Sequence, residues 1–309
     1  MKHVKEAKGV ILSFVLLNYN NVDYTIPCIN SIHETVNVPY EIIVVDNAST
    51  DDSIEKLSKI DEIKLVRNTA NRGFTGGNND GARIAEGKYV VILNNDTNVY
   101  GSNINKLPGI MKKHDKFDVI GGKVVGMDGK TQASGGFEPT AIELFLQFTV
   151  LIYKYFHFPW VKRIDWNNAG FKEVEWASGC FFVMRLDSYL EMGGFDENIF
   201  IYIDEVELHK RARSLGGRVF IYPDIIINHY GQISWGGNNH YVGLRHNYNS
   251  ATYFLGKHRS SFEKWLFIVT VKMINLVYLP FFALMKLVTM GKKGKINTKL
   301  KFCLTVLLA

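Results

Sequence analysis

Cysteines are scarce in this sequence, and they form no pattern. Cys28, Cys180 and Cys303 are far apart in 309 residues and lack any metal-ligand spacing. This excludes a disulfide framework and a cysteine-based zinc site, and it favours a reducing compartment. The N-terminal stretch MKHVKEAKG is polar, and the apolar run after it is too short for a signal-peptide core. We therefore expect the active part of the chain to stay in the cytoplasm.

Two nucleotide-binding fingerprints are also absent. The glycine-rich stretch Gly73–Asn78 lacks the spacing G-x-G-x-x-G and follows the third predicted strand, whereas a dinucleotide fold requires that motif after the first. A Walker phosphate loop, G-x-x-x-x-G-K-[ST], is missing as well. Dehydrogenase and P-loop ATPase functions are therefore disfavoured.

The charge is positive, and much of the excess lies late in the chain. The formal net charge is +6 and the pI is about 9.0. Six lysines between Lys286 and Lys301 flank apolar sequence, so an anionic membrane surface explains them better than nucleic acid does. We find no recognition helix or aromatic-basic interleaving, and we expect no nucleic-acid partner.

The first hundred residues alternate between buried strands and helices. The predicted strands are Val10–Leu17, Glu41–Val45, Ile63–Val66 and Tyr89–Leu93, and the predicted helices between them are Asp23–Glu34, Ser53–Lys59 and Phe74–Glu86. Such alternation predicts an α/β fold with a parallel, doubly wound sheet flanked by helices.

Polar residues follow each of these strands. Asn18, Asp46, the loop 71–78 and Asp96 come after the first, second, third and fourth strands. The carboxyl ends of parallel strands lie along one edge, so we expect these residues to converge on one crevice. A carboxylate there can hold a divalent cation, and the cation can hold phosphates. The alternative for Asp96 is a solvated Asn-Asn-Asp turn.

Later segments predict further elements. Val119–Val125 and Glu175–Arg185 are expected to be strands, the latter running through Ser178 and Gly179, and His209–Leu215 is expected to be a basic helix. Ala141–Trp160 is either a buried helix or an exposed apolar surface that touches lipid or a lipid-linked substrate.

Six segments in order resemble the family-2, GT-A-type inverting glycosyltransferases, in particular their rhamnosyltransferase and galactofuranosyltransferase-like branch. They are VLLNYNN, EIIVVDNASTDDS, NRGFTGGNNDGARIAEGKYVVILNNDT, WASGCFFVMR, GGFDENIFIYIDEVELHKRAR and the later His229. The resemblance implies a GT-A fold, with a Rossmann-like, mostly parallel sheet.

The resemblance also implies roles for individual residues. The nucleotide-sugar contacts would come from Asn18, Asp46, Asn71, Gly73, Gly77, Asn94 and Asn95. The acceptor side would be lined by Trp176, Ser178, Gly179 and Trp235. Trp235 either stacks on the acceptor or simply packs.

The metal and the general base are implied in the same way. Asp96 ends a segment that matches D-x-D, with Asn94 in place of the first aspartate, and His229 would complete a site for Mn²⁺ or Mg²⁺. Asp204 and Glu205 match the family's acidic pair in reversed order, so position favours Glu205 as the base and residue type favours Asp204. The alternatives are an ordinary histidine at 229 and a solvated helix start at 204–205.

The C-terminal region is strongly apolar. Phe262–Val288 is long enough to span a bilayer, but Lys272 and Asn275 lie inside it and Pro280 is expected to break it. We therefore expect C-terminal membrane-associated helices that lie on the cytoplasmic face, peripheral or monotopic. The predicted organisation is a nucleotide-sugar half at 1–118, an acceptor and catalytic half at 119–240, and a helical membrane-associating region at 241–309.

The expected function is metal-assisted transfer of a sugar, with inversion, to a glycan or lipid-linked acceptor of the cell envelope. The resemblance ranks dTDP-rhamnose first and a UDP-linked hexose or galactofuranose second as donor. The rivals are a nucleotidyltransferase on a similar sheet and a non-catalytic glycan-binding or scaffold protein at the membrane. The oligomeric state stays open.

Overall fold

The computed structural model describes residues 9–148, 170–231, 240–288 and 294–308. The chain divides into two compact units. The first comprises residues 1–138, 163–200 and 204–234, and the second comprises 139–162, 201–203 and 235–309. The predicted boundaries at residues 118 and 240 stay a prediction.

A nine-stranded mixed sheet forms the first unit. Its strands are β1 (Leu12–Asn18), β2 (Tyr40–Asp46), β3 (Ile63–Arg67), β4 (Tyr89–Asn94), β5 (Thr97–Asn98), β6 (Val119–Gly126), β8 (Lys172–Val174), β10 (Phe181–Arg185) and β11 (Val219–His229). The order is β3-β2-β1-β4-β10-β6-β11-β5, and β8 pairs with β11. Strands β3, β2, β1 and β4 are parallel, as are β6 and β11, whereas β10 runs antiparallel between β4 and β6.

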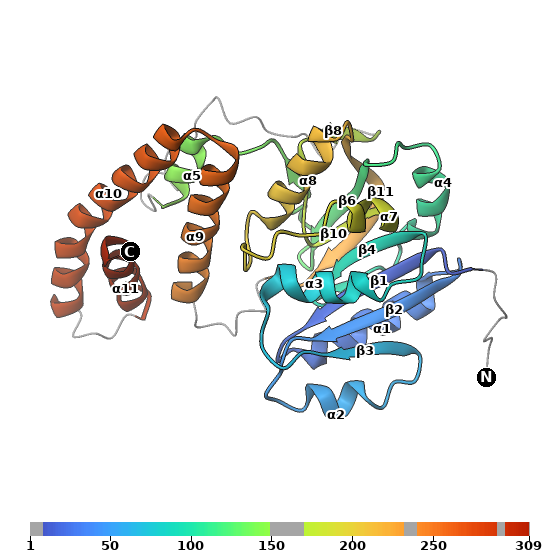
Figure 1. The fold of residues 1–309 in the computed structure, drawn as a ribbon. Helices are drawn as coiled ribbons and strands as arrows, with labels where there is room; N and C mark the ends of the chain where they lie inside the picture. The colour runs from blue at the N-terminus through green and yellow to red at the C-terminus, as the bar shows by residue number, and fades with distance from the viewer. Residues whose placement is uncertain (1–8, 149–169, 232–239, 289–293, 309) are drawn as a thin grey trace. The chain divides into compact units, whose positions relative to one another are not determined.

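Helices cover both faces of this sheet (Figure 1). They are α1 (Val22–Thr35), α2 (Ser53–Leu57), α3 (Gly73–Arg83), a 3₁₀ turn at Ile104–Lys106, α4 (Leu107–Met111), α7 (Leu186–Glu191) and α8 (Asp204–Ser214). One core layer joins the sheet to α1, α2 and α4, and the other joins it to α3, α7 and α8. The predicted α/β architecture with a mostly parallel sheet flanked by helices is confirmed.

The sequence pattern was wrong about one strand. The predicted strand Glu175–Arg185 is two strands, β9 (Trp176–Ala177) and β10, separated by a turn at residues 178–180. The turn is closed by the Phe181 N–H, which donates to the Ser178 carbonyl at 3.1 Å. Strand β9 pairs outside the main sheet, with β7 (Gly135–Gly136). Apolar composition alone cannot locate such a turn, because both halves read as one buried run.

A second correction concerns the basic helix expected at His209–Leu215. Helix α8 begins five residues earlier, at Asp204. Three acidic residues lie in its first turn, where negative charge is favoured by the helix dipole, and Arg211 and Arg213 lie in its last turn. The acidic pair therefore belongs to the helix rather than to a preceding segment.

Helices form the second unit. They are α5 (Ala141–Phe148), α9 (His240–His258), α10 (Ser261–Val288) and α11 (Gly294–Leu308). Phe148 packs against Tyr248, Phe267 and Phe302 with ring centroids 5.8–6.0 Å apart, so side chains of all four helices share one apolar cluster. The rest of the predicted 141–160 segment lies outside the described residues.

The expected break at Pro280 is wrong, since α10 continues through that residue. Proline removes one helical hydrogen bond and costs about 3 kcal/mol in a helix interior. Buried contacts of Phe267, Val271 and Phe282 lie on both sides of Pro280 and stabilise the continuous helix.

Candidate active site

The predicted nucleotide residues gather at the carboxyl edge of β1, β2 and β4. Asn18 and Asp46 are register partners on adjacent parallel strands, and the Asn18 amide donates to the Asp46 carboxylate at 2.8 Å. Asn94 ends β4, opposite Leu17 of β1. The structure therefore brings together residues that are 28 and 76 positions apart.

Thr25, which the sequence pattern did not indicate, extends this arrangement. Its hydroxyl donates to Asn18 Oδ1 at 2.7 Å and accepts from Asn95 Nδ2 at 2.7 Å. Thr25 is fully buried in the second turn of α1. A continuous hydrogen-bonded chain thus runs from Asp46 through Asn18 and Thr25 to Asn95, directly beside Asp96.

The expected loop 71–78 is helical from Gly73 onward, as the start of α3, and Asn47, which was missed as a single residue, organises the turn that leads into it. Its side-chain NH₂ donates to Asn71 Oδ1 at 2.9 Å and to the Gly73 carbonyl at 3.0 Å. Its side-chain oxygen, Oδ1, accepts a hydrogen bond from the Arg72 backbone N–H at 3.0 Å. The available signal was its place in the polar cluster after β2. Asn47 therefore fixes the predicted residues Asn71 and Gly73 against the end of β2.

Gly73 and Gly77 have packing roles that need no ligand. Gly73 has φ +74°, and a Cβ there would lie 2.5 Å from the Phe200 carbonyl oxygen. A Cβ on Gly77 would lie 2.2 Å from the side chain of Leu17. Gly73 excludes larger residues because backbone lies against it, whereas a larger residue at Gly77 would require the Leu17 side chain to shift.

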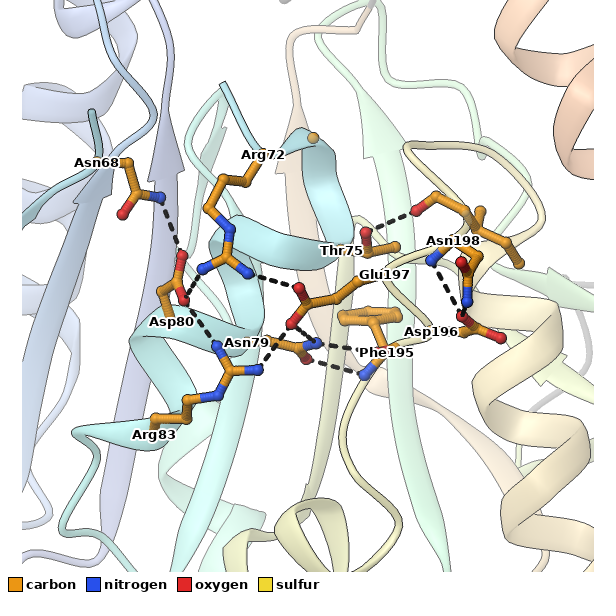
Figure 2. A network of polar contacts seen from close by, with 12 residues as sticks. Asn68, Arg72, Thr75, Asn79, Asp80, Arg83, Phe195, Asp196, Glu197 and Asn198 are labelled. Atoms are coloured by element: carbon orange, nitrogen blue, oxygen red, sulfur yellow. Dashed lines mark hydrogen bonds and ion pairs between the residues drawn. The ribbon is translucent and has the colours of Figure 1, made fainter. Parts of the chain in front are cut away.

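Charged residues tie α3 to the loop that precedes the acidic pair (Figure 2). Arg72 and Arg83 each pair with both Asp80 and Glu197, and the Arg83–Glu197 distance is 2.7 Å. Asn79 donates to the Phe195 carbonyl at 2.9 Å and accepts from the Phe195 N–H at 2.9 Å. The loop 195–200 is therefore fixed to α3, which contains the glycine-rich stretch.

Asp96 and His229 face each other although 133 residues separate them. Strand β5 pairs antiparallel with the end of β11, which places His229 opposite Thr97. His229 Nε2 lies 3.2 Å from Asp96 Oδ1, and His229 Nδ1 contacts Gln132 Oε1 at 2.7 Å. Asp96 is 2% exposed, so the predicted solvated turn is excluded.

The donor set fits a divalent cation. Within the described ranges, Asp96 Oδ1 is buried and accepts no hydrogen bond, which is costly for a carboxylate unless a cation completes it. A divalent ion in a nucleotide site can be bound by one or two protein ligands together with water and phosphate oxygens. In the part of the chain that the structure describes, no third His, Cys, Asp or Glu joins the pair.

Asp204 and Glu205 have different surroundings at the start of α8. Asp204 is 4% exposed, whereas Glu205 is partly exposed and its Cβ lies 3.8 Å from where a Cβ of Gly179 would be. Burial raises the pKa of the Glu205 carboxyl, against hydrogen bonds from its own N–H and from that of Gly179. Glu205 is therefore the more accessible carboxylate.

The backbone before the acidic pair is strained. Tyr202 and Ile203 have φ +67° and +62°, a region that a β-branched residue such as isoleucine rarely adopts. Ser250 of α9 donates to the Ile201 carbonyl at 2.7 Å and so supports this segment. Strained backbone of this kind is found at functional sites, where the surrounding structure maintains it.

The residues of α8 that follow the acidic pair are structural. Glu207 is fully buried and pairs with Arg211 at 2.8 Å, and Arg211 also donates to the Met192 and Gly194 carbonyls. His209 is fully buried too, and burial lowers its pKa to about 3. Its Nδ1 accepts from the Ala177 N–H at 3.1 Å, which joins α8 to β9.

The predicted acceptor residues are only partly assembled. Trp176 donates from its indole N–H to the Phe137 carbonyl at 2.9 Å, and Ser178 lies in the turn before β10. Gly179 lies beside Phe74 and Glu205. Trp235 lies outside the described residues.

Several curated proteins are similar to this chain, including the following two. A poly(ribitol-phosphate) β-glucosyltransferase of Bacillus spizizenii is 29% identical over 136 residues, which cover 42% of this chain and 21% of that protein. An N-acetylglucosaminyl-diphospho-decaprenol L-rhamnosyltransferase of Mycobacterium tuberculosis is 23% identical over 212 residues, which cover 62% of this chain and 67% of that protein. The chain thus spans only a fifth of the length of the Bacillus relative.

A solved structure and a family model complete the comparison. The crystal structure of GalNAc-T7 with UDP, GalNAc and Mn²⁺ aligns with 80% of this chain and 48% of that one, at a TM-score of 0.60 and 17% identity. The predicted GT-A fold is thereby confirmed. The model of the family described as "Glycosyl transferase family 2" matches residues 13–189, more than half of the sequence. The chain therefore belongs to glycosyl transferase family 2.

Proposed function

We propose that the protein transfers a sugar from a nucleoside diphosphate to a hydroxyl of a glycan or lipid-linked acceptor, with inversion at the anomeric carbon. The observation that carries this proposal is the buried, unpartnered Asp96 Oδ1 beside His229 Nε2, at the sheet edge that also holds Asn18 and Asp46. Relatives that use rhamnose and glucose support the reaction class.

Glu205 is proposed as the general base. In an inverting displacement a carboxylate accepts the acceptor hydroxyl's proton while the hydroxyl oxygen attacks the anomeric carbon from the face opposite the leaving diphosphate. The raised pKa of Glu205 makes it a stronger base than an exposed glutamate. Asp204 is more deeply buried and begins the helix, so we propose that it lies next to the base and is not itself the base.

The donor side is proposed to consist of Asn18, Asp46, Asn71, Gly73, Gly77, Asn94 and Asn95. Asp96 and His229 would hold Mn²⁺ or Mg²⁺, which neutralises charge on the departing diphosphate when bound. Our first candidate donor is dTDP-rhamnose, and a relative named as an L-rhamnosyltransferase supports the choice of sugar. The second candidate is a UDP-linked hexose or galactofuranose, and the aligned crystal structure contains UDP.

Titration of nucleotides separates a transferase from a scaffold protein. UDP, dTDP and GDP are added to the purified protein, with and without Mn²⁺, and binding is followed by calorimetry. We expect one nucleotide to bind at least ten times more tightly with Mn²⁺, because its diphosphate completes the coordination of the ion. Failure of all three to bind under either condition would leave the glycan-binding scaffold as the better proposal.

The acceptor is proposed to be reached at the cytoplasmic face of a membrane, through α10. By its length and composition, this helix could cross a membrane. Its exposed apolar side chains recur at intervals of three and four residues. They are Phe262, Trp265, Leu266, Met273, Leu276, Val277, Phe281, Leu284, Leu287 and Val288.

The one-sided burial of α10 favours an in-plane position. Phe267, Val271 and Phe282 are buried on the opposite side of the helix, which contacts α5, α9 and α11. By helical spacing, Lys272 lies at the margin of the exposed stripe, where a lysine ammonium group reaches anionic headgroups.

Vesicle binding tests this membrane proposal. We expect the full chain to cosediment with vesicles that contain an anionic lipid and to bind less in high salt. Leu276→Glu with Val277→Glu should lower binding at least tenfold, because two charges enter the apolar stripe. Leu190→Glu, at an exposed apolar residue of α7, is the matched control. Equal binding by both variants would contradict the proposed surface.

A further inference from the structure

Gln132 lies at the end of a short hairpin that leads away from β6. The hairpin is closed by a bridge between Val125 and Thr131 and by the Gly126 N–H, which donates to the Lys130 carbonyl at 2.8 Å. The Gln132 N–H donates to the Val124 carbonyl at 2.9 Å. These hydrogen bonds fix the backbone of Gln132, from which the side chain extends toward His229 of β11.

The Gln132 amide contacts His229 through both of its ends. Gln132 Nε2 donates to the His229 carbonyl at 3.4 Å, and Gln132 Oε1 contacts the ring Nδ1 at 2.7 Å. Because the NH₂ end faces a carbonyl, the oxygen end must face the ring, and it accepts the proton of Nδ1. In the neutral imidazole this contact leaves the lone pair on Nε2, the form in which a histidine binds a metal through that nitrogen.

A second acceptor lies close to this nitrogen. Nε2 lies 3.2 Å from Asp96 Oδ1, which accepts no hydrogen bond from any described residue. With the lone pair on Nε2, the ring has no proton to donate to Asp96 Oδ1, so the buried carboxylate oxygen stays without a hydrogen bond unless a cation binds between the two atoms. The Gln132 contact thus maintains an arrangement that costs free energy in the absence of a cation.

Two residues without side chains lie next to the Gln132 amide. Gly126 is the register partner of His229 on β6, and a Cβ there would lie 3.0 Å from Gln132 Nε2. A Cβ on Gly231 would lie 3.5 Å from the same atom. Two glycines therefore border the side chain where it reaches His229.

We infer that Gln132 is a positioning residue for a divalent cation, which acts by fixing the tautomer and ring plane of His229. Hydrogen bonds to the second nitrogen of a metal-binding histidine set its orientation and basicity, and their loss weakens metal binding by about 10- to 100-fold. This inference rests on the proposed function only in taking Asp96 and His229 as the ligands.

Manganese binding measures this role without any need for turnover. The full chain is titrated with Mn²⁺, without and with UDP, and free Mn²⁺ is followed by electron paramagnetic resonance. We expect Gln132→Leu to bind Mn²⁺ at least tenfold more weakly than wild type, because the ring loses its acceptor. Gln132→Glu should bind at least as tightly as wild type, because a carboxylate accepts the same Nδ1 proton.

Matched variants separate this inference from the metal site itself. Lys130→Ala, at an exposed position of the same hairpin, should bind Mn²⁺ like wild type. A Gln132→Leu protein that binds Mn²⁺ within twofold of wild type, while Asp96→Ala does not bind it, overturns the role of Gln132 alone. If Asp96→Ala binds Mn²⁺ as wild type does, or wild type binds none, the proposed metal site and this inference both fail.

Discussion

Replacing Glu205 with glutamine is expected to lower kcat by 10²- to 10⁴-fold and to leave the affinity for the donor nucleotide unchanged. A positioned general base contributes about that factor, and an amide cannot accept the hydroxyl proton. Glu205 lies beside Gly179, and no described contact joins it to Asn18 or Asp46, so nucleotide binding should not change. Initial rates and nucleotide titrations on the same preparation separate the two effects.

The control for this substitution is Glu191→Gln, which changes a surface glutamate of α7 that pairs with Lys116. Asp204→Asn decides between the two acids. If it abolishes turnover while Glu205→Gln retains it, the base is Asp204 and our assignment is wrong.

The pH profile gives a second readout of the same base. The base must be deprotonated to act, so activity rises with pH through its pKa. Because burial raises the pKa of Glu205, the acidic limb of kcat/KM should lie at a higher pH than for an exposed glutamate. The residual activity of Glu205→Gln should lack that limb.

Asp96→Asn is expected to abolish the effect of Mn²⁺ on nucleotide binding and yet not to lower the melting temperature of the metal-free protein. The oxygen that is replaced is buried and unpartnered, so the carboxylate destabilises the metal-free fold. An asparagine amide can donate to His229 Nε2 at the same place. The aspartate at position 96 therefore lowers the stability of the metal-free protein, and its proposed role is to bind the metal.

Two measurements check the expected result for Asp96. Calorimetric titration of the Asp96→Asn protein should give the same Kd for the nucleotide with and without Mn²⁺. In the presence of Mn²⁺, the variant should therefore bind the nucleotide at least tenfold more weakly than wild type does. Thermal unfolding in EDTA should give a Tm equal to or above that of wild type. Asp61→Asn, at an exposed aspartate, should keep the metal response. A Tm several degrees below wild type would mean that Asp96 supports the fold.

The sequence predicted the sheet well because its signal is local. Each of the first four strands is a short apolar run that ends at a polar residue, and parallel pairing then places Asn18 beside Asp46 without further information. The position of Asp96 near His229 followed from the resemblance. The pairing of β5 with β11 that produces this position could not be read from periodicity, because β5 has two residues.

The residues that were missed act through single hydrogen bonds over long sequence separations. Gln132 reaches His229 across 97 residues, and Thr25 reaches Asn95 across 70. Such pairs leave no trace in composition or spacing, since a lone threonine or glutamine has many ordinary roles. The turn between β9 and β10 was missed for a related reason, namely that pairing partners rather than apolar content decide where a strand ends.

The strained segment 201–203 has a consequence for how this protein could be divided. The chain leaves the sheet-containing unit after Phe200, spends three residues in the helical unit, and returns at Asp204. The support for Ile201 comes from Ser250 of α9, far beyond the last strand. A shortened protein that ends after β11 would keep every strand, Asp204 and Glu205. It would lose the hydrogen bond from Ser250 that supports the backbone just before these two acids. The segment 201–203 therefore depends on α9, which lies beyond the last strand in the sequence.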